Sequence, residues 1–386
     1  MIVAADRHTG YPIPCAVSLS AYLESRGPGQ TGDVARVAGS VLLRSKRNIV
    51  PFSRILWIEY SGVPSRSIVE TEASAREEPV FLVGSERSGT TLLRLLLDHH
   101  PDIAFNLESE FLVRQISDTG VFPEIAAYRR KLAEDRVFRH SRFVIDESLD
   151  FPSLVNDFLR QKRERDGKRI VGATVHYDFR KLKYLWPRAK YIYLLRDGRD
   201  VTSSVVQMGW AGNGYVAAKW WLDAESEWSE VRAGLDRSSW LEVRYEELTA
   251  DAPGQLRKIC DFIGVAYSER MFDYVKTSSY SRPDPGQNFK WRRAMRRREV
   301  RLIEARIGSV LAERGYALSA EPPLRIGILH DKWLRLRSRL GALRHRIATY
   351  GLRLVALEFL SRRLGRLVLP NSARRAMDVI VDQNLK

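Results

Sequence analysis

Short apolar runs alternate with longer amphipathic stretches from Glu78 onward. Four of these runs are rich in apolar or β-branched residues, as strands buried inside a parallel sheet tend to be. The predicted strands are Val80–Gly84, Ile170–Val175, Tyr191–Arg196 and Trp240–Tyr245. Apolar residues recur at helical spacing between them, in Thr91–Asp98, Asp200–Met208, Val216–Ala233, Ala252–Ile263 and Arg296–Arg314. Strands separated by helices predict βαβ units, so we expect a three-layer α/β fold with a central parallel sheet flanked by helices.

The two ends of the chain differ in pattern from this alternating part. Residues 1–77 mix Gly, Pro and Ser with isolated apolar runs, and we find no motif there that indicates chemistry. Beyond about Pro322, apolar residues at helical spacing are interleaved with arginines. We therefore expect an N-terminal extension of unknown function (1–77), a central domain (78–318) and a basic amphipathic helical extension (319–386). The last extension fits either a helical hairpin packed on the central domain or attachment to an anionic membrane surface.

Composition narrows the range of partners. The 386 residues are 44% hydrophobic, which is typical of a soluble globular protein. Lys and Arg number 63 against 47 Asp and Glu, giving a net charge of +16 that favours polyanionic partners, a membrane surface or an anionic cosubstrate. The two cysteines, Cys15 and Cys260, are too few for a disulfide framework or a zinc site. Without a signal-like start or a run of roughly 18 apolar residues, we expect a cytoplasmic location, with membrane association as the alternative.

The segment from Gly84 to Thr91 has the spacing of a phosphate-binding loop with one change. Gly84 and Gly89 stand where the pattern GxxxxGK[ST] requires glycine, between a predicted strand and a predicted helix, but Thr90 replaces the lysine. In triphosphate-cleaving enzymes that lysine reaches the β- and γ-phosphates, and the next hydroxyl holds magnesium. The loop therefore predicts a cradle for a single phosphate group, with other cations supplying the charge and no metal.

A second candidate anion site follows the third predicted strand. Arg196 stands at its carboxyl end, where α/β folds bind ligands, and Ser204 follows eight residues later in the next predicted helix. The alternative is that Arg196, Asp197, Arg199 and Asp200 form a surface ion-pair cluster.

Two further segments complete the pattern. Val243–Leu248 reads Val-Arg-Tyr-Glu-Glu-Leu and contains Tyr245, whose ring could stack on a base or support the connection between strand and helix. Residues 278–291 are rich in Pro, Gly and Asp, which indicates a mobile lid outside the sheet.

Together these segments resemble the sulfotransferases that use 3′-phosphoadenosine 5′-phosphosulfate (PAPS), from about Pro79 to about Gly315. The resemblance is closest to the bacterial branch and to the tyrosylprotein sulfotransferases. It implies a P-loop-like fold and metal-independent, in-line transfer of a sulfuryl group from PAPS to a hydroxyl group. The residues that it implies for the 5′-phosphosulfate are Arg87, Ser88, Gly89, Thr90 and Thr91.

The same resemblance implies which residues contact the rest of the cosubstrate. It implies that Arg196 and Ser204 hold the 3′-phosphate and that Tyr245 lies near the adenine. The lid of the tyrosylprotein enzymes opens with a serine and ends in Ser-Lys-Trp, and Ser279 (or its neighbour Ser278) and Lys290 match its two ends.

The chemistry of transfer needs a base and positive charge. Glu108 stands 21 residues after Arg87, as does the catalytic glutamate of the tyrosylprotein enzymes, so the resemblance implies that it is the base; Glu110 is the competing choice. Where relatives carry a Gly-x-Lys segment this chain has Thr174, so the lysine that assists the leaving group is missing. His176 could replace it if protonated, with Lys181 or Lys183 as alternatives. Arg87 and His176 therefore join Glu108 as expected catalytic residues.

Two other function classes remain open at this stage. One is a P-loop small-molecule kinase or NTPase, and the other is a basic protein that binds a membrane or nucleic-acid surface and keeps the loop as a vestige. The expected partner is a hydroxyl-bearing acceptor whose class (sugar, lipid, phenol or tyrosine) the sequence does not define. We expect no specific nucleic acid, and a homodimer is the candidate assembly.

Overall fold

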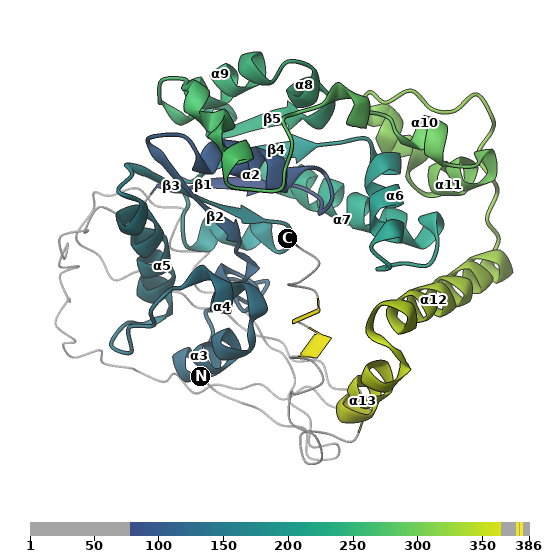
Figure 1. Ribbon diagram of the computed structural model, residues 1–386, viewed down its shortest axis with the longest axis horizontal. Helices are drawn as coiled ribbons and strands as arrows, with labels where there is room; N and C mark the ends of the chain where they lie inside the picture. Colours follow the sequence, from purple (N-terminus) through teal and green to yellow (C-terminus); the bar gives the residue numbers. More distant parts are fainter. Residues whose placement is uncertain (1–77, 364–375, 378, 381–386) are drawn as a thin grey trace, which may run out of the picture. The chain divides into compact units, whose positions relative to one another are not determined.

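The computed structural model describes residues 78–363, 376, 377, 379 and 380, and the N-terminal extension 1–77 lies outside them. Five strands form one sheet in the order β2-β3-β1-β4-β5, and every neighbouring pair is parallel. The strands are β1 (Val80–Val83), β2 (Ile103–Glu108), β3 (Ile170–Val175), β4 (Lys190–Leu195) and β5 (Trp240–Arg244). Figure 1 shows the sheet with helices around it, which confirms the predicted α/β fold class.

The four predicted strands are confirmed to within one residue at each end, but β2 was missed. Its sequence, Ile-Ala-Phe-Asn-Leu-Glu, begins with buried residues and ends with the exposed Leu107 and Glu108. Asn106 interrupts the apolar run, so the segment lacks the continuous pattern of a strand buried on both faces. β2 pairs only with β3 and forms one edge of the sheet.

The five helices predicted inside the domain are confirmed to within two residues at either end. These are α2 (Thr90–Asp98), α6 (Gly198–Gln207), α7 (Gly214–Ala233), α9 (Ala252–Ile263) and α11 (Arg297–Glu313). The sequence analysis missed three helices between β2 and β3 and two short ones after β5. They are α3 (Ile125–Glu134), α4 (Arg136–Ser141), α5 (Phe151–Asp166), α8 (Tyr245–Ala250) and α10 (Trp291–Ala294).

Alternate side chains of each strand point to opposite faces of the sheet, and each face has its own core. On one face, Phe81 and Val83 of β1 pack with buried residues of α5, α7 and α11. On the other, Val80 and Leu82 pack with the leucines of α2 and with α9. Because both faces are covered, the strands are almost wholly apolar, and polar chemistry is confined to their ends.

The parallel register brings the carboxyl ends of the strands to one edge. Thr174 of β3 pairs with Leu82 of β1 on one side and with Glu108 of β2 on the other. The segments that follow β1, β3 and β4 therefore leave the sheet next to one another and next to the end of β2. Open α/β sheets bind their ligands at this edge.

Within the predicted C-terminal extension, the described residues form α12 (Ile328–Tyr350) and α13 (Leu352–Arg363), and the rest of that extension lies largely outside the described residues. α12 contacts the segment before α7: Asn213 donates a hydrogen bond to the carbonyl of Leu334 at 2.7 Å, and the amide of Gly212 donates one to Ser338 at 2.9 Å. No helix in the described part of the chain is long and apolar enough to cross a membrane. The predicted cytoplasmic location stays a prediction.

Candidate active site

The loop between β1 and α2 needs glycine at both of its ends. Gly84 has φ 147° and Gly89 has φ 98°, values that side-chain-bearing residues rarely adopt. An added Cβ would lie 2.7 Å from the carbonyl oxygen of Leu194 at Gly84, and 2.4 Å from the ring of Tyr245 at Gly89. The loop thus passes close to β4 and α8 and leads into the N-terminus of α2. Free backbone N–H groups at such a terminus favour a bound anion.

Two motifs that are far apart in the sequence meet at this loop. The Nε of Arg87 donates a hydrogen bond to the hydroxyl of Ser204 at 2.9 Å, and Arg196 donates one to the carbonyl oxygen of Arg87 at 3.3 Å. Arg87 itself has a left-handed backbone, with φ 69°. The predicted 5′-phosphosulfate loop and the predicted 3′-phosphate pair are therefore parts of one site.

Arg196 is held from several sides. Its guanidinium lies 4.2 Å from the ring centroid of Tyr245, and it donates a hydrogen bond to the carbonyl oxygen of Gln287 at 3.2 Å. A carboxylate oxygen of Asp200, one turn further along the chain, lies 3.8 Å from the guanidinium nitrogen Nη2 of Arg196. Tyr245 is buried, and its ring contacts Arg196 and lies close to Gly89, so it supports both predicted anion-binding segments. A contact of Tyr245 with the adenine stays a prediction.

The alternative of a surface ion-pair cluster after β4 is wrong, because its members are buried. Asp197, Arg199 and Asp200 are each 3% exposed or less. Arg199 forms ion pairs of 2.7 Å with both Asp197 and Glu304 of α11. This network fixes the start of α6, the helix that carries Ser204.

The same network holds the end of the predicted lid. The backbone N–H of Trp291 donates to Asp200 at 2.8 Å and its indole N–H donates to Asp197 at 3.0 Å. These bonds bring Lys290, the neighbour of Trp291, to the start of α6 beside the Arg196 motif. Ser279, at the other end of the lid, is exposed, and the hydrogen bonds of the described residues do not join it to the loop. The structure thus brings one end of the lid to the site but not the other.

Three buried residues connect the loop to β3 and the end of β2. The hydroxyl of Thr90 lies 3.0 Å from Nε2 of His176, and Nδ1 of His176 lies 3.0 Å from a carboxylate oxygen of Glu110. That oxygen also accepts the backbone N–H of His176 at 2.9 Å. Burial alone would lower the pKa of His176, but the hydrogen bond and charge of Glu110 outweigh it and raise that pKa. Burial likewise opposes the ionised form of Glu110, yet His176 lowers the pKa of Glu110.

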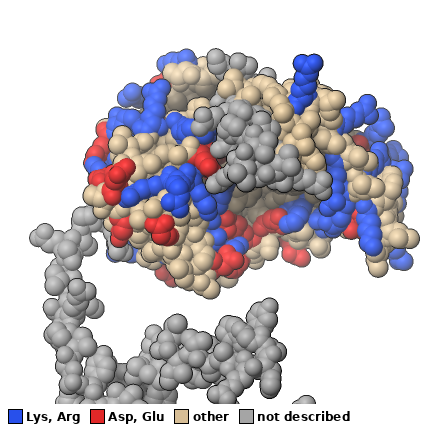
Figure 2. Space-filling model, turned by 90° about the horizontal axis from the view of Figure 1, so that it is seen from below, with Lys and Arg blue, Asp and Glu red and all other residues tan. Residues whose placement is uncertain are grey.

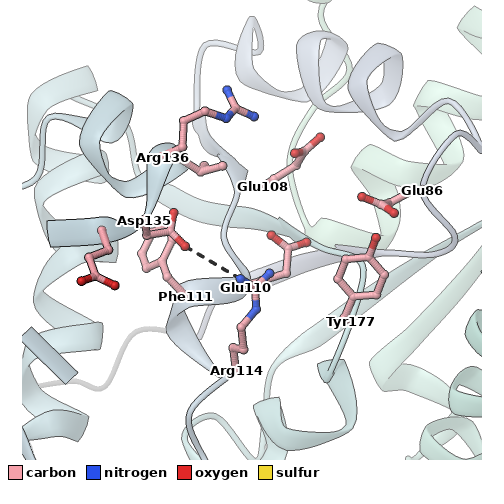
Figure 3. A pocket seen from close by; sticks show the side chains of 10 residues that line it. Glu86, Glu108, Glu110, Phe111, Arg114, Asp135, Arg136 and Tyr177 are labelled. Atoms are coloured by element: carbon pink, nitrogen blue, oxygen red, sulfur yellow. Dashed lines mark ion pairs between the residues drawn. The ribbon is translucent and has the colours of Figure 1, made fainter. Parts of the chain in front are cut away.

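The two candidate bases have different surroundings. The Glu110 carboxylate is buried against His176, whereas Glu108 is exposed at the end of β2. Glu108 lines a cavity of about 260 Å³ together with Glu86 of the loop and Tyr177. Figure 3 shows these three side chains around the same space, which Glu110, Arg114 and Arg136 also line. Glu110 lines the same cavity, so both candidate bases border it, and Glu108 is the exposed one of the two.

Glu86 carries the one carboxylate of the loop from Gly84 to Thr91, and its pKa is shifted. Burial raises its pKa to about 7, while the charge of His176 acts in the opposite direction. Its carboxylate lines the cavity together with Glu108 and Glu110. The sequence analysis did not select it, because nothing in the loop motif distinguishes the residue before Arg87.

These contacts narrow the choice of residue that could replace the missing lysine. Thr174 is buried on β3 and carries no charge. Lys181 forms an ion pair of 2.9 Å with Asp178, and the ammonium of the exposed Lys183 lies 5.4 Å from the ring centroid of Tyr184. His176 is the one of the three candidates that contacts the loop.

Comparison with known proteins agrees with this geometry. Residues 79–269 match the family model described as the sulfotransferase family. These residues belong to the sulfotransferase family. The matched range contains the loop, the Arg196 and Ser204 pair, Glu108, His176 and Tyr245, and ends before the lid.

Curated sulfotransferases share this part of the sequence. Protein-tyrosine sulfotransferase 2 of Gallus gallus is 26% identical over 221 residues, covering 53% of this chain and 56% of the relative. Protein-tyrosine sulfotransferase 1 of Danio rerio is 26% identical over 210 residues, covering 50% and 55%. The chain spans about half the length of the curated relatives it matches.

Sulfotransferase domains also occur among the similar solved structures. The sulfotransferase domain of the Synechococcus PCC 7002 olefin synthase has a TM-score of 0.47 at 22% identity, covering 64% of this chain and 98% of that one. The domain from the curacin biosynthetic pathway has a TM-score of 0.43 at 17% identity, covering 63% and 99%.

Proposed function

We propose that this sulfotransferase-family protein transfers the sulfuryl group of PAPS to a hydroxyl acceptor. The observation that carries the proposal is the hydrogen bond from Arg87 to Ser204, supported by the bond from Arg196 to the Arg87 carbonyl oxygen. Together they join two anion-binding motifs in one site, as a cosubstrate with phosphate groups at two positions requires. A nucleoside triphosphate carries all of its phosphates in one row at the 5′ position and has no separate second phosphate group.

Unpartnered polar atoms around the loop support the fit. Among the described residues, the buried Ser88 hydroxyl and the buried Nε of Arg196 have no hydrogen-bond partner. Burying such groups without a partner costs roughly 1–3 kcal/mol each, so they are suited to a bound ligand. Ser88, Gly89, Thr90 and Thr91 would hold the 5′-phosphosulfate, with Arg87 beside it.

The remaining cosubstrate contacts follow the geometry of the Arg196 motif. Arg196 and Ser204 would hold the 3′-phosphate, and Lys290 would add positive charge from the adjoining end of the lid. Tyr245 would lie under the adenine, and Ser279 would belong to the part of the lid that closes over it. No metal takes part in this proposal, because guanidinium groups and backbone N–H groups supply the positive charge.

The proposed chemistry divides between two sides of the loop. Bound PAPS supplies a sulfuryl group that forms a bond to the acceptor oxygen as its bond to the bridging phosphate oxygen breaks, in line. Glu108 takes the proton of the acceptor hydroxyl, since its exposed carboxylate lines the cavity. Arg87 and protonated His176 stabilise the charge that develops on the leaving phosphate, His176 through Thr90.

The acceptor is proposed only as a hydroxyl compound. The curated relatives are named for the tyrosine residues of proteins, so a tyrosine peptide is the first acceptor to test. A sugar, a lipid and a small phenol follow, because a cavity lined by both carboxylates and arginines does not select among them. A homodimer remains the proposed assembly.

Calorimetry with PAPS and with magnesium-ATP tests the cosubstrate directly. We expect PAPS to bind and magnesium-ATP to bind much more weakly; tight ATP binding without PAPS binding would favour the kinase alternative. Incubation with ³⁵S-labelled PAPS and a host extract, followed by identification of the labelled product, then defines the acceptor. Binding of DNA or vesicles that survives Arg87→Ala, without transfer to any acceptor, would favour a surface-binding protein with a vestigial loop.

A further inference from the structure

Helix α12 uses only one of its faces to contact the domain. Leu334 and Ser338 are 1% and 3% exposed, and both take part in the hydrogen bonds to residues 212 and 213. The face extends to Gly341 and His345, which lie close to Gly212 and Gly209. These four residues are three or four positions apart, so they form one stripe along the helix.

A second apolar stripe lies on the opposite side of α12. At about 100° per residue it covers an arc of roughly 80°, centred about 150° from the contact face. Its residues are Leu329, Trp333, Leu336, Leu340 and Leu343, and each is between 44% and 81% exposed. A stable soluble helix needs only one apolar stripe to pack on its domain, so this second one indicates another apolar partner.

Basic residues border the exposed stripe on both sides. On the same helical wheel, Lys332, Arg335, Arg339 and Arg346 follow one border, and Arg337 and Arg344 follow the other. The single acidic residue of α12, Asp331, lies toward the contact face and bonds to Tyr215 at 3.0 Å and to Arg335. Six basic residues against one acidic residue give the helix a net charge of +5.

The surface view agrees with this charge distribution. Figure 2 shows Lys and Arg on both sides of the face, including the right, where Figure 1 places α12, and Asp and Glu mostly at its left and near the hollow in its middle. An apolar stripe between basic borders matches the boundary between the acyl chains and the head groups of an anionic bilayer. A protein partner would have to supply an apolar groove and acidic rims along the whole length of the stripe.

We propose that α12 attaches the protein to anionic membrane surfaces, lying in the plane of the interface. The exposed leucines and Trp333 enter the boundary region while the bordering arginines contact lipid phosphate and carboxylate groups. The helix does not cross the bilayer in this proposal, since seven of its 23 residues are charged. This attachment does not depend on the proposed sulfuryl transfer.

Flotation of the full chain with vesicles tests the proposal. We expect binding to vesicles of phosphatidylcholine mixed with phosphatidylserine, and little binding to phosphatidylcholine alone. Leu336→Ser combined with Leu340→Ser should reduce binding at least about tenfold, because two exposed apolar side chains no longer enter the lipid. Arg337→Gln combined with Arg344→Gln should weaken binding to the anionic vesicles and reduce its dependence on salt.

The control is Val121→Ser, which removes an exposed apolar residue elsewhere on the domain and should leave binding unchanged. Circular dichroism of each variant establishes that it is folded. Equal vesicle binding by wild type and by the leucine variant would overturn the proposal. A second outcome would also overturn it: the wild type forms a concentration-dependent dimer and does not bind vesicles, and Leu336→Ser with Leu340→Ser dissociates that dimer. The stripe would then bind a second copy of the chain.

Discussion

The Nε of Arg87 donates a hydrogen bond to the hydroxyl of Ser204 across 117 residues of sequence, at 2.9 Å. Arg87 belongs to the loop after β1, and Ser204 to the helix after β4, which are neighbouring strands at the centre of the sheet. The fold itself therefore brings together the two predicted anion-binding segments. Such preorganisation reduces the ordering that binding requires.

Substitutions at Arg196 and Glu108 separate binding from turnover. Arg196→Ala should raise the Kd for PAPS by about 10–100-fold, since a charged hydrogen bond is worth roughly 1.5–3 kcal/mol. Glu108→Ala should leave that Kd nearly unchanged and lower transfer by roughly 10²–10⁴-fold, because it removes a base. Calorimetry and transfer of the ³⁵S label measure the two effects. Arg188→Ala, at a surface ion pair, is the control, and wild-type activity in both site variants would refute the assignment.

The pair of His176 and Glu110 should stabilise the fold over a limited pH range. His176 has a raised pKa, so its contribution is complete below the ordinary value near 6.5 and is lost as the pH rises through the raised one. Glu110 has a lowered pKa, so its contribution is complete above the ordinary value near 4.5 and is lost as the pH falls through the lowered one. Both contributions are present in full between those two values.

Glu110→Gln should therefore lower stability by about 3–5 kcal/mol within that range, because it leaves a buried histidine without its carboxylate. It should also move the titration of the His176 ring to lower pH, as followed by NMR. A stability change without movement of the His176 titration would mean that Glu110 acts only by packing. The groups that face His176 are Glu110, Glu86, Glu108 and the hydroxyl of Thr90.

Gly89→Ala should cost more stability than Gly264→Ala, although the two glycines have nearly the same backbone. Their φ angles are 98° and 94°, but a Cβ at Gly89 would meet the Tyr245 ring at 2.4 Å, while nothing lies within 4 Å at Gly264. Both variants lose about 1–3 kcal/mol to backbone strain. The difference in their unfolding free energies measures the close approach of the ring, and equal losses would contradict it.

Glu86→Gln should change how stability depends on pH. Burial raises the pKa of Glu86 from an ordinary value near 4.5 to about 7, so the folded chain binds more protons than the unfolded chain between those values. Wild-type stability at this site accordingly falls as the pH rises from 4.5 to 7. At pH 8 the glutamine variant should be more stable by about 1–3 kcal/mol, with little difference near pH 4. Thermal unfolding at the two pH values tests this, and a constant difference would contradict it.

Local patterns predicted the parts of the site that lie within one short segment. The loop from Gly84 to Thr91 and the spacing of Arg196 and Ser204 depend on a strand followed directly by a helix, which the sequence shows clearly. Strand β2 was not predicted, because Asn106 interrupts its apolar run and its last two residues face solvent. The order of the strands in the sheet was not predicted either.

Contacts between distant segments could not be predicted from residue spacing. The role of Glu110 depends on His176, 66 residues later, and the burial of Arg199 depends on Glu304 of α11. Charged residues at such spacing are more often solvated on the surface, so the sequence alone favoured neither the buried pair nor the buried network. The residues lining the cavity come from the loop after β1, from β2 and the segment after it, from α3 and α4, and from the segment after β3, and only the fold brings them together.

The position of β2 at the edge of the sheet has a consequence for how such a protein diversifies. Most residues proposed for the phosphate groups of the cosubstrate follow β1 and β4, two inner strands, whereas Glu108 ends an edge strand and lines the proposed acceptor cavity with residues of α3 and α4. Insertions and substitutions around an edge strand leave central strand pairing intact. New acceptor preferences can therefore arise in descendants of this chain without change to the segments that follow the central strands.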